Sequence, residues 1–285
     1  MNKADRSRHY NDRVRKAIAK PRLQDTLHRF ADAYVIAREA AFAGQDFEAL
    51  RTAIGEMKDE VRDNLARYRD EFIANAEAAG AKVTIARTAA EANAYICNLA
   101  KERGVKIVVK SKSMASEETH LNHALKDAGV EALETDLGEW IIQLAGERPS
   151  HMVMPAIHML KEEVAELFSK VTGKQEPAEI LHLVRLARRQ LRQAYLDADM
   201  GITGANVAIA ETGGLALVTN EGNARLTSTL PKIHVALVGM EKLVPTLADA
   251  NRIINVLPKN ATGQLITSYI CLLYTSPSPR DKIHD

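Results

Sequence analysis

The first quarter of the chain has the hydrophobic period of α-helices. Between residues 11 and 79, apolar residues recur three or four positions apart and charged residues fill the opposite face. The clearest stripe comprises Phe47, Leu50, Ile54, Met57, Val61 and Leu65. Asp46 stands before this stripe, where a helix N-cap is expected. The pattern predicts a helical N-terminal region over residues 1–75. A stripe of this width is typical of a helix packed on its own domain, and a coiled-coil arm for a partner is the alternative.

From Lys82 onward, short apolar runs alternate with helical segments. Strands are predicted at 82–86, 105–110, 130–136, 150–155, 207–210, 215–219, 232–240 and 266–270. Helices are predicted at 88–104, 116–127, 161–171, 177–198 and 247–257. Apolar runs without alternation are typical of strands that are buried on both faces. We therefore expect an α/β domain over residues 76–270, with a mainly parallel sheet covered by helices.

Two of the predicted strands, 207–210 and 215–219, flank a short Gly-rich turn and predict a β-hairpin. Polar and glycine residues gather at both of its ends, more densely than a turn requires. We interpret them as ligand-binding or protein-recognition residues, the alternative being a hairpin with well-satisfied turns. Glu211 and Glu221 would lie at opposite ends of the second strand, which disfavours a paired-carboxylate mechanism. The candidate residues are Glu211, Thr212, Gly213, Gly214, Asn220, Glu221, Gly222, Asn223 and Arg225.

A second candidate site follows the strand predicted at 105–110. Ligands of parallel α/β sheets bind outside the carboxyl ends of the strands, and the run "KSKSM" leaves this strand there. Ser111, Lys112 and Ser113 could hold a phosphate or a small carboxylate beside the start of the next helix. Ordinary turn and capping chemistry is the alternative interpretation of these serines.

Composition and charge narrow the function classes. The 285 residues are 46% hydrophobic and 26% charged, as in soluble folded domains. The net charge of +1 gives no reason to expect nucleic acid or an anionic membrane as the main partner. No apolar run is long enough for a membrane span, and the basic first 22 residues lack the apolar stretch of a signal peptide. Two cysteines exclude a disulfide framework and indicate a reducing compartment.

The sequence contains no recognisable catalytic machinery and no metal site. It has no nucleophile elbow, phosphate loop or dinucleotide-binding glycine motif. Glu117, His120 and His123 share one predicted helix face, and His158 and Glu162 are four residues apart. Neither group comes with a further ligand whose position can be argued, so metal is not predicted. We expect His158 to hydrogen-bond locally and His234 to be a satisfied core histidine.

Four longer runs of the sequence resemble a known protein family. "VVKSKSMASEETHLNHAL", "VEALETDLGEWIIQLAGERPSHMVMPAIH", "GITGANVAIAETGGLALVTNEGNARLTSTLPKIHVALVGMEKLVP" and "LPKNATGQLITSYI" resemble the LUD domain of the lactate-utilization protein B family, over about residues 8–270. The resemblance implies a fold related to the sugar-phosphate isomerase and CoA-transferase-like group. It also implies a cytoplasmic complex with other lactate-utilization subunits that oxidises L-lactate to pyruvate. A small carboxylate is then the expected substrate.

The resemblance further implies electron transfer through two [4Fe–4S] clusters in a ferredoxin-like segment that follows the LUD domain. This chain lacks such a segment, so we expect no cluster on it and interpret it as the LUD-domain fragment of an iron–sulfur protein. One alternative is a stand-alone ligand-binding or CoA/acyl-transfer enzyme of the same fold group, with Glu211 as nucleophile. Another is a scaffold that docks the partner subunits.

The end of the chain does not share this resemblance. The eleven residues "CLLYTSPSPRD" correspond one for one to the translation of a transposon-type sequencing adapter. We interpret residues 271–285 as an adapter artefact and expect the native frame to stop at about Ile270. The segment is therefore expected to be disordered and unpacked.

Overall fold

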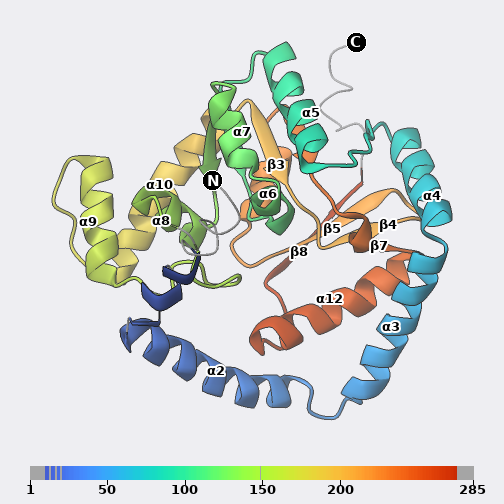
Figure 1. Ribbon diagram of the computed structural model, residues 1–285, viewed down its shortest axis with the longest axis horizontal. Helices are drawn as coiled ribbons and strands as arrows, with labels where there is room; N and C mark the ends of the chain where they lie inside the picture. Colours follow the sequence, from blue (N-terminus) through green and yellow to red (C-terminus); the bar gives the residue numbers. More distant parts are fainter. Residues whose placement is uncertain (1–9, 13, 17, 20, 148, 275–285) are drawn as a thin grey trace.

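The computed structural model describes residues 10–274, apart from 13, 17, 20 and 148, and contains two four-stranded sheets surrounded by helices (Figure 1). Its helices are α2 (Pro21–Ala41), α3 (Phe47–Asp63), α4 (Leu65–Ala78), α5 (Ala89–Glu102), α6 (Met114–Glu118), α7 (Leu121–Asp127), α8 (Leu137–Ala145), α9 (Lys161–Thr172), α10 (Ile180–Asp197), α11 (Asn223–Thr229), the 3-10 turn η1 (Met240–Lys242) and α12 (Leu247–Thr262). Its strands are β1 (Ile107–Lys110), β2 (Glu131–Glu134), β3 (Met200–Thr203), β4 (Val207–Ile209), β5 (Gly214–Thr219), β6 (Ile233–Ala236), β7 (Leu243–Val244) and β8 (Tyr269–Leu273).

The first sheet is wholly parallel, in the order β2–β1–β3–β6. Its central residues, among them Val108 and Ile202, are fully buried, and α5 and α7 pack against them. Helix α11 contacts β3 so closely that a Cβ on Gly201 would lie 1.8 Å from the carbonyl oxygen of Thr227, which explains the glycine. A parallel sheet covered by helices confirms the predicted α/β class.

The second sheet contains the predicted hairpin. Its order is β7–β4–β5–β8, and β4 pairs antiparallel with β5 across the turn at residues 210–213. Gly213 in this turn has φ +66°, and a Cβ there would lie 2.2 Å from the backbone nitrogen of Ala76 in α4. The turn therefore requires a glycine both for its backbone conformation and for the close approach of the helix.

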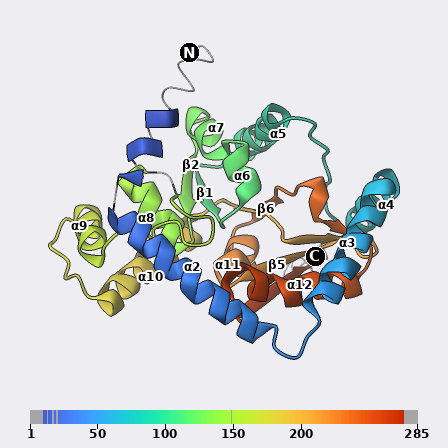
Figure 2. The same ribbon diagram turned by 60° about the horizontal axis from the view of Figure 1, so that its bottom comes forward.

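The N-terminal helices pack on the domain. Helices α2, α3 and α4 run around its outside, next to α12 and the second sheet (Figures 1 and 2). Met57 and Val61 of α3 enter the same core as α12 and the hairpin, and Lys58 Nζ donates to the carbonyl oxygens of Glu241 and Leu243 at 2.8 Å. The structure thus confirms an amphipathic helix that packs on its own domain, rather than a coiled-coil arm for a partner.

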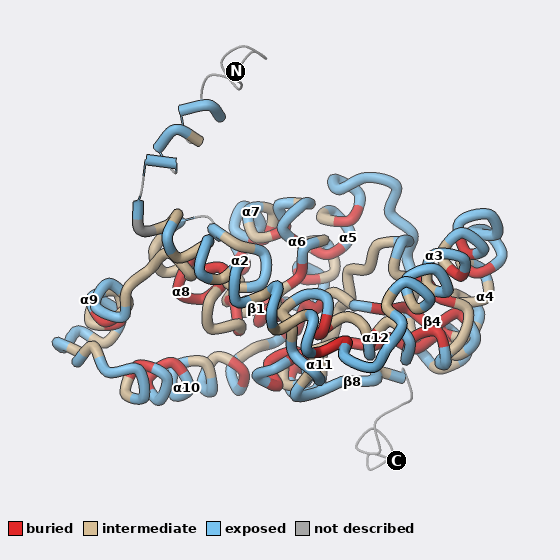
Figure 3. Tube along the Cα trace, turned by 90° about the horizontal axis from the view of Figure 1, so that it is seen from below, coloured by how far each residue is buried: buried red, intermediate tan, exposed pale blue. Residues whose placement is uncertain are grey.

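A separate lobe is formed by α8, α9 and α10, around Trp140, Phe168 and Leu186. Figure 3 shows that the buried residues of α10 lie on one side of the helix, while its other side is exposed. Within the described residues, no helix is long and apolar enough to cross a membrane.

Two predicted strands are wrong. Residues 82–86 connect α4 to α5 without strand pairing, and most of their side chains are exposed. Residues 150–155 form bends, because His151 Nδ1 accepts hydrogen bonds from the backbone nitrogens of Val153 and Met154. Such local side-chain bonds occupy backbone groups that a sheet ladder would need. The helix predicted at 116–127 is broken into α6 and α7 at His120, which has φ 55°.

The expectation of an unpacked tail is wrong for its first residues. Strand β8 pairs antiparallel with β5 from Tyr269 to Leu273, and Cys271 lies opposite Leu217. Because β5 offers backbone donors and acceptors at its edge, a continuing chain can pair there largely irrespective of its side chains. Residues 275–285 lie outside the described part of the chain, and the adapter origin stays a prediction.

Candidate functional site

The candidate site lies at the carboxyl ends of the central parallel strands. The chain leaves β1 toward β2 on one side, and β3 is neighboured by β6 on the other, so the strand order reverses between β1 and β3. Ligands of open α/β sheets bind at such a switch point. The loop after β1 meets the loop after β3 here, since a Cβ on Gly204 would lie 2.8 Å from Ser113 Oγ.

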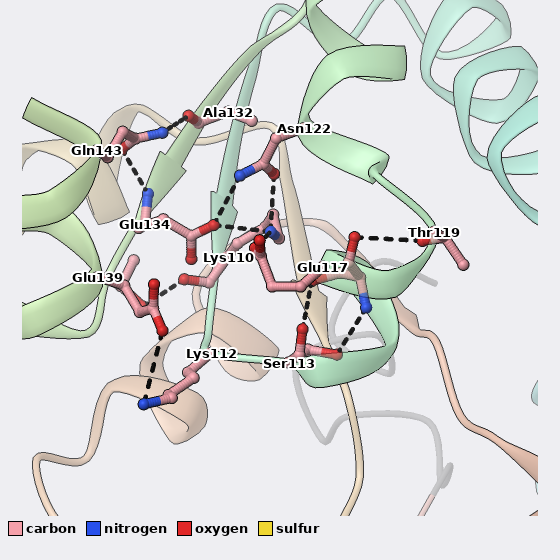
Figure 4. Close-up of polar contacts among 12 residues, drawn as sticks. Lys110, Lys112, Ser113, Glu117, Thr119, Asn122, Ala132, Glu134, Glu139 and Gln143 are labelled. Atoms are coloured by element: carbon pink, nitrogen blue, oxygen red, sulfur yellow. Dashed lines mark hydrogen bonds and ion pairs between the residues drawn. The ribbon is translucent and has the colours of Figure 1, made fainter. Parts of the chain in front are cut away.

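Lys110, the last residue of β1, is fully engaged by protein groups (Figure 4). Its Nζ donates to Glu134 Oε1 and to Asn122 Oδ1, both at 2.7 Å, and lies 3.7 Å from Glu117 Oε1. Asn122 Nδ2 also donates to Glu134 Oε1, at 2.9 Å. The Lys110 side chain is 1% exposed. This closed network gives Lys110 a structural role.

Lys112 has a different environment although it lies only two residues further. Its Nζ is buried and forms no hydrogen bond with any residue that the structure describes. Glu139 Oε1 lies 3.6 Å away, which is an ion-pair distance but too long for a good hydrogen bond (Figure 4). An ammonium group carries three donors, and buried donors are normally satisfied. Lys112 therefore has hydrogen-bonding capacity that the described protein groups leave unused.

Glu139 faces Lys112 from the first turn of α8, where its backbone nitrogen donates to the N-cap Asp136 at 3.1 Å. Burial raises the pKa of Glu139 to about 7. This value already includes the ammonium of Lys112, which lowers the pKa, and the carboxylates of Glu134, Asp136 and Glu117, which raise it. Burial dominates, so this carboxyl group can carry a proton near neutral pH. The sequence analysis missed Glu139, although its place just beyond a predicted parallel strand could have indicated it.

Glu221 approaches the same region from the loop before α11. Burial and the carboxylate of Asp136 raise its pKa, while a hydrogen bond from the Leu137 backbone nitrogen at 3.4 Å and the charge of Lys112 lower it. A pocket of about 280 Å³ opens between the start of α8 and residues 153–157, and Asp136 and Glu221 line its polar side. Glu221 is exposed to solvent and lies near enough to Lys112 for the charge of that lysine to lower its pKa.

The two predicted serines of this loop have structural roles. Ser113 Oγ accepts a hydrogen bond from the Ser116 backbone nitrogen at 3.3 Å, and the Ser113 carbonyl oxygen accepts one from Ser116 Oγ at 2.8 Å. Ser111 continues the sheet, since its backbone nitrogen donates to the carbonyl oxygen of Ile202 at 3.0 Å. Capping and pairing account for both residues, which leaves Lys112 as the residue of this run with free donors.

The turn of the hairpin lies away from Lys112. Glu211 Oε1 accepts a hydrogen bond from the Leu247 backbone nitrogen at 2.6 Å, at the start of α12, and Thr212 Oγ1 accepts one from the Gly214 backbone nitrogen at 3.2 Å. Glu211 borders a second pocket of about 600 Å³, between α3, α4 and the start of α12. The charged residues that line this pocket with Glu211 are Glu56, Glu60, Arg67, Glu71, Asp249 and Arg252.

Three further hairpin candidates have structural roles. Asn220 Oδ1 accepts hydrogen bonds from Thr267 Oγ1 and from the Ser268 backbone nitrogen, at 3.2 and 3.3 Å. Asn223 Oδ1 accepts one from Thr219 Oγ1 at 2.6 Å, in a buried position. Gly222 precedes α11 with φ +73°.

Arg225 is exposed on α11, and its carbonyl oxygen accepts hydrogen bonds from Ser228 and Thr229. Glu211 and Glu221 therefore lie at opposite ends of β5, as predicted, and the charge of Lys112 acts on Glu221.

Two histidines that the sequence analysis considered hydrogen-bond to protein groups. His234 Nε2 lies 2.9 Å from Thr203 Oγ1, and burial lowers its pKa to about 4, as expected for a core histidine. His158 hydrogen-bonds to Ser150 and Glu147, as predicted. Among the described residues, no group of three or more His, Cys, Asp or Glu side chains is placed to hold a metal ion. A [4Fe–4S] cluster is held by four thiolates, so the chain's two cysteines do not fit one.

A family model and the curated relatives agree on one family. The family model for the LUD domain matches residues 69–284. The chain is 41% identical to lactate utilization protein B of Lysinibacillus sphaericus over 266 residues, which cover 93% of this chain and 56% of the relative. It is 43% identical to lactate utilization protein B of Shouchella clausii over 226 residues, covering 79% of this chain and 48% of that one.

The chain thus spans about half the length of these curated relatives. Among solved structures, a DUF162 family protein from Deinococcus radiodurans has a TM-score of 0.25 and 14% identity, covering 67% of this chain and 91% of that one. The family model covers most of the sequence, from the middle of α4 to the end. The chain therefore belongs to the LUD domain family.

Proposed function

We propose that this chain is the LUD-domain part of a lactate-utilization protein of the B type. The observation that carries the proposal is its 41% identity to lactate utilization protein B of Lysinibacillus sphaericus over 93% of the chain. In this proposal the protein acts in the cytoplasm with other lactate-utilization subunits, and together they oxidise L-lactate to pyruvate.

The residues of this chain indicate which functions of such a protein it could carry and which belong elsewhere. The two cysteines of this chain cannot hold a [4Fe–4S] cluster, so the two clusters and the electron transfer are assigned to the part of the relatives that this chain does not cover. This chain would contribute the folded α/β domain, its binding site and surfaces for the partner subunits. The pocket next to Glu221, about 280 Å³, suits a small substrate rather than a large cofactor.

A fusion protein tests this assignment. In a Lysinibacillus sphaericus strain without its lactate utilization protein B gene, the matching part of that protein is replaced by the present chain, and growth on L-lactate as the carbon source is measured. The native gene is the positive control. We expect the fusion to restore growth and L-lactate-dependent reduction of an artificial electron acceptor in cell extracts. A fusion that accumulates as a folded protein but restores neither would contradict the proposal.

The CoA- or acyl-transfer alternative depends on a free nucleophile at Glu211. Its carboxylate instead accepts a hydrogen bond from the first backbone nitrogen of α12, a common structural role for an acidic side chain. We therefore expect the isolated chain to show no CoA-thioester exchange. Exchange that is abolished by Glu211→Ala would favour the alternative.

A further inference from the structure

A serine, a histidine and a glutamate form a chain of hydrogen bonds in the segment between α8 and α9. Ser150 Oγ lies 2.7 Å from His158 Nδ1, and His158 Nε2 lies 2.9 Å from Glu147 Oε2. A hydroxyl, an imidazole and a carboxylate in this order activate a serine nucleophile on several unrelated folds. Such a group is recognised by its geometry and by the role of each member, not by sequence order.

The carboxylate of Glu147 decides which nitrogen of His158 carries the proton. An ionised carboxylate only accepts hydrogen bonds, so His158 Nε2 is the donor of this pair. In the neutral ring Nδ1 is then an acceptor, and the hydroxyl of Ser150 donates to it. The same nitrogen can take the serine proton when Ser150 Oγ attacks a substrate. The contacts therefore place His158 as a general base and Glu147 as the residue that positions it.

The members of this group differ in exposure. The side chain of His158 is 11% exposed, that of Glu147 is 50% exposed, and Ser150 is exposed. The imidazole is thus held between its two partners, while the hydroxyl can be reached from solvent. The arrangement combines a shielded base with an accessible nucleophile, as nucleophilic catalysis requires.

Backbone donors follow Ser150 directly. Within the described part of the chain, the backbone nitrogens of His151 and Met152 form no hydrogen bond. The next two backbone nitrogens, those of Val153 and Met154, donate to His151 Nδ1 at 3.1 and 3.2 Å. The backbone nitrogen that follows a nucleophile is a common donor to the oxyanion of acyl transfer. The nitrogens of His151 and Met152 are thus available to stabilise such an oxyanion.

The surroundings of Ser150 restrict the size of the substrate. Ser150 lines neither of the two pockets described above. The apolar side chains of Met152 and Val153, shortly after it in the sequence, are 67% and 42% exposed. An open surface of this kind offers few contacts to a long acyl chain or a nucleotide. A short-chain ester fits best, because little more than its reacting carbonyl group has to be held.

We propose that Ser150, His158 and Glu147 form a hydrolytic site that transfers short acyl groups from oxygen esters to water. Ser150 Oγ attacks the carbonyl carbon of the ester, and its proton passes to His158 Nδ1. The bond from this carbon to the alcohol oxygen breaks, and the alcohol leaves with that proton. Water then attacks the acyl group on Ser150 and gives a proton to His158 Nδ1. The carboxylic acid leaves, and Ser150 Oγ recovers the proton from His158. This activity does not depend on a role in lactate utilization.

Hydrolysis of p-nitrophenyl acetate by the whole 285-residue chain tests the site. We expect release of p-nitrophenol above the rate in buffer, over several turnovers per chain. Ser150→Ala and His158→Gln should each lower kcat/KM by about tenfold or more. Glu147→Gln should lower kcat with little change in KM, because Glu147 contacts His158 and not the substrate.

Ser268→Ala is the matched control and should hydrolyse the ester like the wild type. Ser268 is exposed, and no histidine among the described residues hydrogen-bonds to it. Absence of hydrolysis above the buffer rate by the folded wild-type chain would overturn the proposal. Equal activity of the wild type and Ser150→Ala would overturn it as well.

Ser150→Cys keeps the proposal testable if Ser150→Ala does not fold, since it retains a donor at this position. A thiol beside an imidazole ionises more readily and reacts faster with iodoacetamide. The thiol introduced by Ser150→Cys should react about fivefold or more faster than that of Ser268→Cys, as measured by mass spectrometry of the modified peptides. Equal rates at the two positions would overturn the proposal, and the hydrogen bonds of Ser150 and His158 would then only close the loop.

Discussion

Removing the carboxylate of Glu134 should strongly destabilise the fold, because it leaves the ammonium of Lys110 buried without its main counter-ion. Lys110 is 1% exposed and Glu134 is 5% exposed, and their 2.7 Å bond joins the central strand β1 to β2. Breaking a buried pair by removing one partner costs about 3–5 kcal/mol. Glu117 lies 3.7 Å from the same ammonium and is 44% exposed, so it can move closer and compensate in part. We therefore expect Glu134→Leu to cost about 3 kcal/mol, near the lower end of this range.

Urea denaturation followed by far-ultraviolet circular dichroism measures this cost. The double variant Lys110→Met/Glu134→Leu should be more stable than Glu134→Leu alone, because it no longer buries an unpaired charge. Glu48→Leu is a suitable control: it breaks the exposed pair with Arg51 and should cost about 1 kcal/mol or less. If Glu134→Leu costs no more than this control, Glu134 does not neutralise Lys110 and the interpretation of the network is refuted.

Three further predictions concern stability. Glu139→Gln should stabilise the protein more at about pH 8 than at about pH 5. The pKa of Glu139 is raised from its ordinary value of 4.5 to about 7 in the fold, so the wild type loses stability as the pH rises from 4.5 through 7. Urea unfolding at both pH values checks this, and equal effects at both would contradict it. His234 has a pKa lowered to about 4 in the fold, while 6.5 is its ordinary value, so the unfolded chain binds the proton first and stability should fall as the pH drops from 6.5 toward 4. His234→Gln should flatten this acid limb, and a His234 ring resonance that titrates near pH 6.5 in the native protein would contradict the reasoning. Gly201→Ala should destabilise by about 2 kcal/mol or more, since its Cβ would clash with the carbonyl oxygen of Thr227, whereas Gly55→Ala, in open space within α3, should stabilise by about 0.5–1 kcal/mol. Thermal or urea unfolding of both variants measures the contrast, and equal effects would contradict it.

The parts of the fold that could be predicted are those whose local pattern and tertiary role agree. Runs such as 105–110 and 207–210 are apolar because both faces of the strand are covered, so burial alone specifies them. A strand also needs a neighbour with free backbone groups. The apolar run at 82–86 finds none, and at 150–155 the ring of His151 takes the backbone nitrogens first. Neither the missing neighbour nor the competing ring can be read from hydrophobic pattern alone.

The candidate site could be predicted in position but only partly in composition. Lys112 follows from the rule that ligands bind beyond the carboxyl ends of parallel strands. Glu139 lies just beyond the strand predicted at 130–136, so its position could have been inferred in the same way. Its raised pKa could not, because that results from burial and from the carboxylates of Glu134, Asp136 and Glu117, which the fold brings close. Conversely, Asn220 resembles a ligand residue in the sequence, but its partners are Thr267 and Ser268, nearly fifty positions away. Long-range contacts decide which polar side chains remain free for a ligand.

The different roles of Lys110 and Lys112 follow from where β2 ends. The partners of the two lysines come from different elements. Lys110 lies opposite Glu134, the last residue of β2, and its charge is neutralised within the sheet. Two residues further there is no β2 residue opposite, and the facing acid comes from α8 at 3.6 Å, too far for a good hydrogen bond. The end of a strand thus separates a lysine whose donors are used within the sheet from one whose donors the described residues leave unused.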